Sequence, residues 1–295
     1  MEFGPGAATQ ELLGVKPSRV RRLPGSGNDH WLVTTGPSRW ILRRFAVTHD
    51  WPSVEWEQSV IRELANHGWP VPEAVGGPTE LEGRIWMAMR RLPGRPMATT
   101  SSTSFERGRL LARMHTDLSS VQVGQRPGWS QLHQVATRLP EFLDDLPEVL
   151  AERIPDRAGE VSRRMVDFTH QTLGRLRSSA LDELPVSAVH GDLMPWNILV
   201  HQGEVSGVLD FEKAHVDLQA TDLAFATWGG RYEHDVVAGY ESERGPLDFS
   251  YDLLQLLWAT TCLYALQRHL SLRRDGVATG GLGWAIEHAL RPWGT

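Results

Sequence analysis

One polar stretch constrains this chain more than any other, because it sets charged and amide side chains beside strand-forming residues. The segment "HGDLMPWNILV" (190–200) carries Asp192 and Asn197 directly before the apolar run 198–200. Asp and Asn are poor strand formers, and a carboxylate next to a buried strand is costly unless something binds it. The pattern predicts either a ligand site or a loop that satisfies its own polar groups.

A turn at 201–204 returns the chain through "VSGVLDF", so the segment is one half of a predicted β-hairpin. Antiparallel pairing brings the two ends of a hairpin together, and Asn197 and Asp210 should therefore be neighbours. Their amide and carboxylate oxygens suit Mg²⁺, and Asp192 could accept a proton from an attacking hydroxyl or orient that hydroxyl. In the alternative interpretation, Asp192 and Asn197 only hydrogen-bond their own loop.

Composition narrows the class of protein. The chain has 295 residues, 41% hydrophobic and 22% charged, which allows one large domain or two smaller ones. The net charge of −6 argues against a general nucleic-acid or anionic-membrane binder, and the one cysteine, Cys262, excludes an internal disulfide. No secretory signal is visible, and the most apolar window, 253–266, fits a buried helix better than a membrane span. We expect a cytoplasmic protein.

Local patterns change along the chain from strands to helices. Residues 30–45 predict a β-hairpin, residues 53–67 a helix, and residues 83–92 a further strand. Beyond residue 97 the pattern is mostly helical, including two or three helices within 129–184. The layout predicts an α+β fold with a small β-rich N-terminal lobe (1–92) and a larger, mostly helical C-terminal lobe (93–295).

The motifs "HGDLMPWN" and "LDFE" resemble the catalytic and metal-binding loops of the aminoglycoside phosphotransferase and choline kinase family, relatives of the protein kinases. The resemblance covers about residues 20–230. It implies a bilobal protein-kinase-like fold that transfers the γ-phosphoryl group of ATP or GTP to a hydroxyl of a small molecule, such as an aminoglycoside or other antibiotic, an amino alcohol or a sugar. It also implies that Asp192 is the catalytic base, that Asn197 and Asp210 hold Mg²⁺, and that His190 braces the loop.

Phosphoryl transfer also needs groups that hold the triphosphate. The loop before the first predicted strand carries Gly25, Ser26 and Gly27, whose backbone amides can approach an anion closely. Such a loop is more often an ordinary turn, but its place before a β-hairpin in a chain with the motifs above favours phosphate binding.

The family resemblance implies a lysine on the next strand, whereas the only lysines are Lys16 and Lys213. Arg43 stands at the matching place, and strand alternation points Arg44 to the opposite face. Arg can grip phosphate with its planar fork, although its geometry is not that of Lys. Glu57 lies on the apolar face of the predicted helix and matches the helix glutamate of the family, so we predict an Arg43–Glu57 ion pair. The alternative is a glutamate that reaches water from the margin of that face.

Several other residues carry weaker expectations. Fold analogy alone places Met89 behind the nucleotide base and the backbone of Arg90 and Leu92 against it. Asp222 resembles a family acid that anchors the catalytic loop, and a carboxylate near a helix N-terminus is favourable in any case. His115 is expected to be a core histidine. Acidic residues are expected on solvated faces, with an acceptor pocket for a polyamine-like substrate as the alternative: 141–148, Glu241, Glu243, Asp248 and Asp252.

The leading hypothesis is a Mg²⁺-dependent small-molecule kinase whose partners are a nucleoside triphosphate and a hydroxylated compound, with no nucleic acid and no membrane. Antibiotic resistance is one role that such an activity could serve. A nucleotide-binding pseudokinase that senses without turnover is the second hypothesis, and the missing lysine is its support. A metal-dependent hydrolase with water as the acceptor is the third.

Overall fold

The computed structural model describes residues 4–24, 27–136, 146–153, 155–179, 181–227 and 231–274, together with residues 276 and 283. Contacts within the chain divide it into two compact units. Unit 1 comprises Met1–Thr103, Arg113–Trp129 and His190–His215, and unit 2 comprises Ser104–Ala112, Ser130–Val189 and Val216–Thr295. The hairpin with Asn197 and Asp210 thus belongs to the same unit as the first hundred residues, while a domain boundary at 92–93 stays a prediction.

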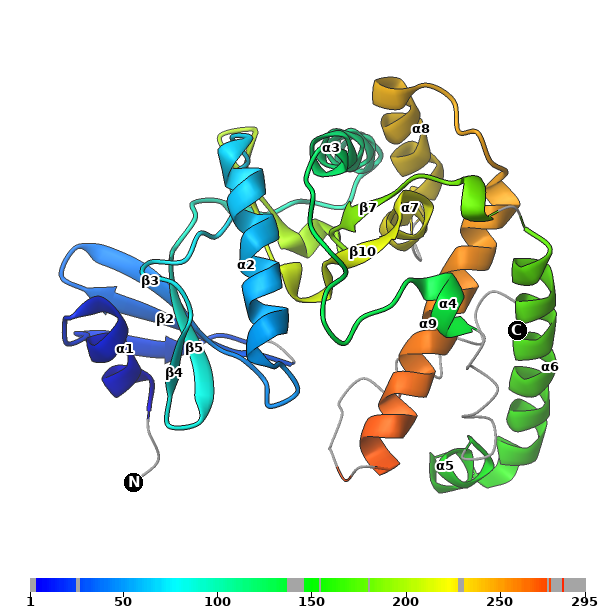
Figure 1. The fold of residues 1–295 in the computed structure, drawn as a ribbon, viewed down its shortest axis with the longest axis horizontal. Coiled ribbons are helices and arrows are strands. Elements are labelled where there is room, and N and C mark those ends of the chain that lie inside the picture. Colours follow the sequence, from blue (N-terminus) through cyan, green and yellow to red (C-terminus); the bar gives the residue numbers. More distant parts are fainter. Residues whose placement is uncertain are drawn as a thin grey trace. The chain divides into compact units, whose positions relative to one another are not determined.

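Unit 1 contains a five-stranded antiparallel sheet with the order β1-β2-β3-β5-β4 (Figure 1). The predicted hairpin is present as β2 (Asp29–Thr35) and β3 (Ser38–Arg44), and the third predicted strand is β5 (Arg84–Arg90). The sequence patterns did not predict three short elements: the helix α1 (Pro5–Leu13) and the strands β1 (Arg19–Arg22) and β4 (Thr79–Leu81).

Each face of this sheet packs against one helix, and strand alternation sorts the side chains between the faces. Ala8 of α1 packs against Leu42 and the stacked rings of Trp31 and Trp86, whose centroids lie 5.3 Å apart. Val54, on the other side, belongs to a cluster with Phe45, Met87 and Met89, which also includes Ile41. Since Arg43 is odd-numbered like Ile41, it extends toward this second cluster.

The helix that supplies Val54 is α2 (Trp51–Asn66), close to the predicted range. It starts at this point because the side chain of Asp50 accepts a hydrogen bond from the backbone N–H of Ser53 at 3.0 Å, which caps the first turn. It ends before Gly68, whose φ of 83° is the left-handed conformation that terminates helices. Glu57 is fully buried on the apolar face, which excludes the alternative that it reaches water.

A second, three-stranded sheet in unit 1 has the order β6-β8-β9, formed by β6 (Arg95–Pro96), β8 (Ile198–His201) and β9 (Glu204–Val208). Gln202 and Gly203 both have positive φ, as a tight two-residue hairpin turn requires. The sequence placed Asn197 and Asp210 at strand ends, but both lie just outside the strands. Asn197 ends the 3₁₀ turn Pro195–Asn197, and Asp210 precedes the 3₁₀ turn Phe211–Lys213 with a left-handed φ of 67°.

Unit 2 is mostly helical. Helix α7 (Gln219–Thr227) is buried along its whole length, and α9 (Tyr251–Arg274) contacts α4, α6 and α7. The window 253–266 lies inside α9 with Cys262 buried, as predicted. The remaining elements are α3 (Ser101–Ser119, shared with unit 1), α4 (Leu132–Ala136), α5 (Leu146–Arg153), η2 (Pro155–Arg157), α6 (Ala158–Arg177), η3 (Leu181–Glu183), β7 (Val186–Val189), β10 (His215–Leu218) and α8 (Glu233–Arg244).

The fold class is therefore α+β, with a small antiparallel sheet and a larger helical part, as the sequence predicted. Within the part of the chain that the structure describes, no helix is both long and apolar enough to span a bilayer.

Candidate active site

The loop after β7 is held by His190. Its Nδ1 accepts a hydrogen bond from the backbone N–H of Asp192 at 3.1 Å, so Nε2 carries the proton and donates to the carbonyl of Leu209 at 3.0 Å. The ring also packs on Phe211, with centroids 4.6 Å apart. His190 therefore ties the loop to the returning arm of the hairpin.

Asn197 makes the second connection between this loop and the returning arm of the hairpin. Its side-chain amide nitrogen donates to the carbonyl of Asp192 at 2.9 Å, and its own carbonyl accepts from the N–H of Leu209 at 2.8 Å. Since Asp210 directly follows Leu209 in the chain, the bond from Leu209 places the backbone of Asp210 close to that of Asn197. The side chains of Asn197 and Asp210 offer an amide oxygen and a carboxylate, which are oxygen donors of the kind that Mg²⁺ prefers.

These two donors fit a Mg²⁺ ion that is completed by substrate oxygens and water, because Mg²⁺ is commonly bound through one or two protein carboxylates plus phosphates. The described residues hold no group of three or more His, Cys, Asp and Glu side chains suited to a metal, so an all-protein metal cage is not formed by them.

The carboxylate of Asp192 is paired with Lys213, whose Nζ lies 2.9 Å from Oδ2. Burial raises the pKa of Asp192, and the positive charge of Lys213 opposes that rise. Gly191, with φ 75°, lets the loop pass close to this segment, since a side chain there would collide with the carbonyl of Lys213. In the sequence, Lys213 was notable only as one of the two lysines, and its contact with Asp192 was not predicted.

The predicted ion pair between Arg43 and Glu57 is present and buried. Glu57 has a second partner, because Nη2 of Arg126 lies 3.2 Å from its Oε2. A carboxylate this deeply buried is costly unless its charge is compensated, and two arginines share that task here.

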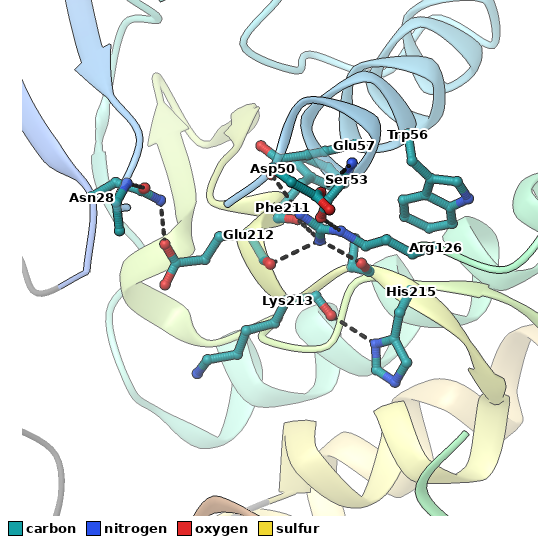
Figure 2. A network of polar contacts seen from close by, with 12 residues as sticks. Asn28, Asp50, Ser53, Trp56, Glu57, Arg126, Phe211, Glu212, Lys213 and His215 are labelled. Carbon is teal, nitrogen blue, oxygen red and sulfur yellow. Dashed lines mark hydrogen bonds and ion pairs between the residues drawn. The ribbon is translucent and has the colours of Figure 1, made fainter. Parts of the chain in front are cut away.

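Arg126 contacts several residues of the site at once (Figure 2). Its guanidinium donates to the hydroxyl of Ser53 at 2.8 Å and to the carbonyls of Glu212 at 2.8 Å and Ala214 at 2.7 Å. It is fully buried, with the ring of Trp129 5.1 Å away. Arg126 thus connects α2 to the segment that follows Asp210. It stands in a loop without periodicity, so no sequence signal pointed to it.

The carboxylate of Glu212 faces back toward the start of β2 (Figure 2), where its Oε2 accepts a hydrogen bond from the side-chain amide of Asn28 at 2.6 Å. Burial, followed by the nearby charge of Asp210, raises the pKa of Glu212 to about 7. Glu212 is the last residue of the motif "LDFE", but no role was predicted for it.

The other predicted nucleotide-binding residues are placed as follows. Gly25 and Ser26 lie outside the described residues. Met89 is buried in the same cluster as Phe45, on the face of the sheet that carries Arg43. Arg90 ends β5 as an exposed residue and Leu92 is half-buried beyond it. Their contacts with a nucleotide base stay predictions.

The residues with weaker expectations are largely accounted for by packing. His115 is fully buried, and Asp222 is buried in the first turn of α7, while its anchoring role stays a prediction. Asp248 and Asp252 are exposed, as expected of a solvated face, while Glu243 pairs with Arg109 at 2.7 Å and Glu241 accepts from the N–H of Leu247 at 3.0 Å. An acceptor pocket at these residues stays a prediction. Residues 141–145 lie outside the described part.

A hollow of about 550 Å³ lies on the α1 side of the sheet, lined by Leu12, Leu13 and Trp40 among others. It contains none of the predicted site residues, and it is on the face opposite Arg43. We therefore assign the candidate site to the residues around Asp192 and Arg43.

The chemistry brought together here is that of a protein-kinase-like phosphotransferase: an acid on a braced loop, two oxygen donors at a hairpin end, and a buried arginine–glutamate pair. The model of the phosphotransferase enzyme family matches residues 19–257, and the chain belongs to that family. Membership makes it a small-molecule kinase by class.

Individual relatives are more distant. A homoserine kinase of Gluconobacter oxydans (strain 621H) is 26% identical over 84% of this chain and 79% of its own length. An amicoumacin kinase in complex with AMP-PNP, Ca²⁺ and Ami superposes with a TM-score of 0.69 at 15% identity, over 96% of this chain and 91% of that chain. A microcompartment-associated aminopropanol kinase superposes with a TM-score of 0.66 at 20% identity, over 96% and 93%. At these identities the two structures show the shared protein-kinase-like fold.

Proposed function

We propose that this chain transfers the γ-phosphoryl group of ATP or GTP to a hydroxyl group of a small, amine-bearing molecule, with Mg²⁺ as the cofactor. The observation that carries the proposal is the bonding of Asp192 and Asn197 to each other and, through Leu209, to the segment that begins at Asp210. The Lys213–Asp192 contact and the buried Arg43–Glu57 pair lend further support, because both bring charged side chains to this site.

The acceptor class is supported by what related proteins act on. Homoserine and aminopropanol are the substrates in the names of two proteins that resemble this chain, and both compounds carry an amine and a hydroxyl group. Other structural neighbours are described as aminoglycoside phosphotransferases. An amino alcohol or an amine-bearing antibiotic is therefore the acceptor class to test first.

Each site residue then has a defined task. Lys213 holds Oδ2 of Asp192, and the Asp192 carboxylate takes the proton of the acceptor hydroxyl as the new O–P bond forms and the bond to the leaving diphosphate breaks. Asn197 and Asp210 would hold Mg²⁺, which, when bound, neutralises charge on the phosphates.

Arg43, oriented by Glu57, and the loop at Gly25, Ser26 and Gly27 would hold the triphosphate. Met89 with the backbone of Arg90 and Leu92 would receive the base.

Mass spectrometry after incubation with ATP, Mg²⁺ and a panel of amino alcohols and aminoglycosides tests this function directly. We expect one compound to gain a single phosphate. Tight ATP binding with no product and no phosphate release would instead identify a nucleotide sensor. Phosphate release without any phosphorylated compound would identify a hydrolase.

The metal assignment predicts that Asp210→Asn weakens the binding of ATP in the presence of Mg²⁺ by about tenfold or more, because one anionic ligand is lost. Asn tolerates the left-handed backbone of this position, so the conformation is kept. Calorimetry with Mg²⁺ and with EDTA measures the effect. Binding in EDTA should not fall, and unchanged binding with Mg²⁺ would remove Asp210 from the metal site.

The contact at Asp192 predicts that Lys213→Met lowers kcat by about tenfold to a hundredfold, with the KM for ATP changed less than about threefold, because a catalytic group that is misplaced loses rate rather than affinity. Lys213→Arg should restore part of the rate, and the only other lysine provides the control variant, Lys16→Met. A KM effect without a kcat effect would contradict this assignment. The acceptor that gains phosphate in the panel serves as the substrate.

A further inference from the structure

The guanidinium of Arg43 is only partly used by its neighbours. Nη1 bonds to Glu57, whereas Nε and Nη2 are buried and have no hydrogen-bond partner among the described residues. Buried donors of a charged group are rarely left without partners, because the loss of hydration is then not compensated. The unfilled positions on Arg43 point to an anionic ligand that is not a fixed part of the protein.

A carboxylate of the chain already lies close to these donors. Oε2 of Glu212 is 3.9 Å from Nη2 of Arg43, too far for a hydrogen bond but close enough for ionic attraction. The same oxygen accepts the hydrogen bond from Asn28. It also lies beside Gly27, since a methyl group placed on that glycine would be 3.4 Å from it.

The backbone keeps Glu212 at this place. The carbonyl of Glu212 is bonded to Arg126, which is itself buried against Ser53 and Glu57 (Figure 2). The side chain is one-fifth exposed, and withdrawal of the residue from Gly27 would break the contact of its carbonyl with Arg126.

We propose that Glu212 makes nucleotide binding depend on the bound cation. Its negative charge stands beside Arg43 and Gly27, where the phosphates would be received, so it repels a free polyphosphate. A cation held at Asn197 and Asp210 offsets that charge, and the metal complex of the nucleotide is then selected over the free nucleotide. The inference rests on the proposed function, because it takes the nucleotide phosphates to lie at Arg43.

Glu212→Gln tests the inference, because glutamine keeps the size of the side chain and can still accept the hydrogen bond from Asn28. Calorimetry at about pH 8, where a carboxylate is ionised, would measure the binding of ATP in EDTA, of ATP with Mg²⁺, and of inorganic tripolyphosphate in EDTA. We expect Glu212→Gln to bind metal-free ATP and tripolyphosphate at least about tenfold more tightly than the wild-type protein does. Binding of ATP with Mg²⁺ should change less than about threefold.

Glu204→Gln is the matched control, since Glu204 is an exposed glutamate at the start of β9 in the same unit, and it should change none of the three affinities. Equal metal-free affinities for Glu212→Gln and the unchanged protein would overturn the inference. A loss of binding only with Mg²⁺ would also overturn it, by making Glu212 a cation ligand. Glu212→Ala serves as the second variant should the glutamine substitution impair folding.

If the wild-type protein bound no ATP in the presence of Mg²⁺, the proposed function would be contradicted. The comparison of tripolyphosphate binding between Glu212→Gln and the wild-type protein would still decide whether this carboxylate blocks an anion site.

Discussion

Asp192→Asn is expected to lower kcat by about a hundredfold to ten-thousandfold while ATP binding in the presence of Mg²⁺ changes less than about threefold. Asparagine keeps the size of the side chain and can still bond to Lys213, but it cannot take the proton of the acceptor hydroxyl. The backbone bonds of residue 192 to His190 and Asn197 do not involve the carboxylate, so the loop should keep its conformation. Steady-state kinetics with the identified acceptor and calorimetry with ATP measure the two effects.

The control is Asp182→Asn, because Asp182 is an exposed carboxylate in the turn Leu181–Glu183 of unit 2. It should leave kcat unchanged. If Asp192→Asn turned over at the rate of the unchanged protein, Asp192 could not be the base, and the phosphotransfer mechanism would need another proton acceptor.

Arg126→Met is expected to lower the free energy of unfolding by about 3–5 kcal/mol, the cost of removing one partner of a buried ion pair. Glu57 would keep only Arg43, and the carbonyls of Glu212 and Ala214 would lose their donor. Urea unfolding followed by circular dichroism and by tryptophan fluorescence measures the change, and the ring of Trp129 lies close enough to Arg126 to report on it.

Arg109→Met separates the loss of a buried cation from the loss of any arginine. Arg109 also contacts two carboxylates, those of Glu106 and Glu243, but its side chain is 37% exposed, and ion pairs that water can reach contribute little to stability. We expect no measurable change for this variant. Equal stabilities of Arg126→Met and the unchanged protein would show that the guanidinium is not needed to hold α2 and the segment after Asp210.

Local patterns explain the predictions that the structure confirms. Strand alternation separates Arg43 from Arg44, and helical periodicity places Glu57 on the buried face of α2, so their pairing could be expected from the positions of two side chains on two regular elements. The hairpin that returns the chain from Asn197 to Asp210 follows from alternation and a two-residue turn.

The exact position of the metal-binding side chains could not be predicted in this way. Asp210 follows the end of β9 with a left-handed φ, a conformation that non-glycine residues rarely adopt, although Asp and Asn adopt it more often than the others, so local patterns do not predict it. The surroundings of Asp210 include Arg126, which holds the next residues by their carbonyls.

The amino-acid order alone specified the two hairpins, the helix α2 and the strand β5, the faces on which charged side chains lie and the set of oxygen donors, because these depend on residues a few positions apart. The assembled fold was needed to reveal that Lys213 holds Asp192, that Arg126 serves Glu57, and that Glu212 reaches Asn28, 184 positions away. Such contacts depend on how separate elements pack against each other. Periodic patterns predict the faces of helices and strands, but they do not predict which partner a polar residue in a loop will contact.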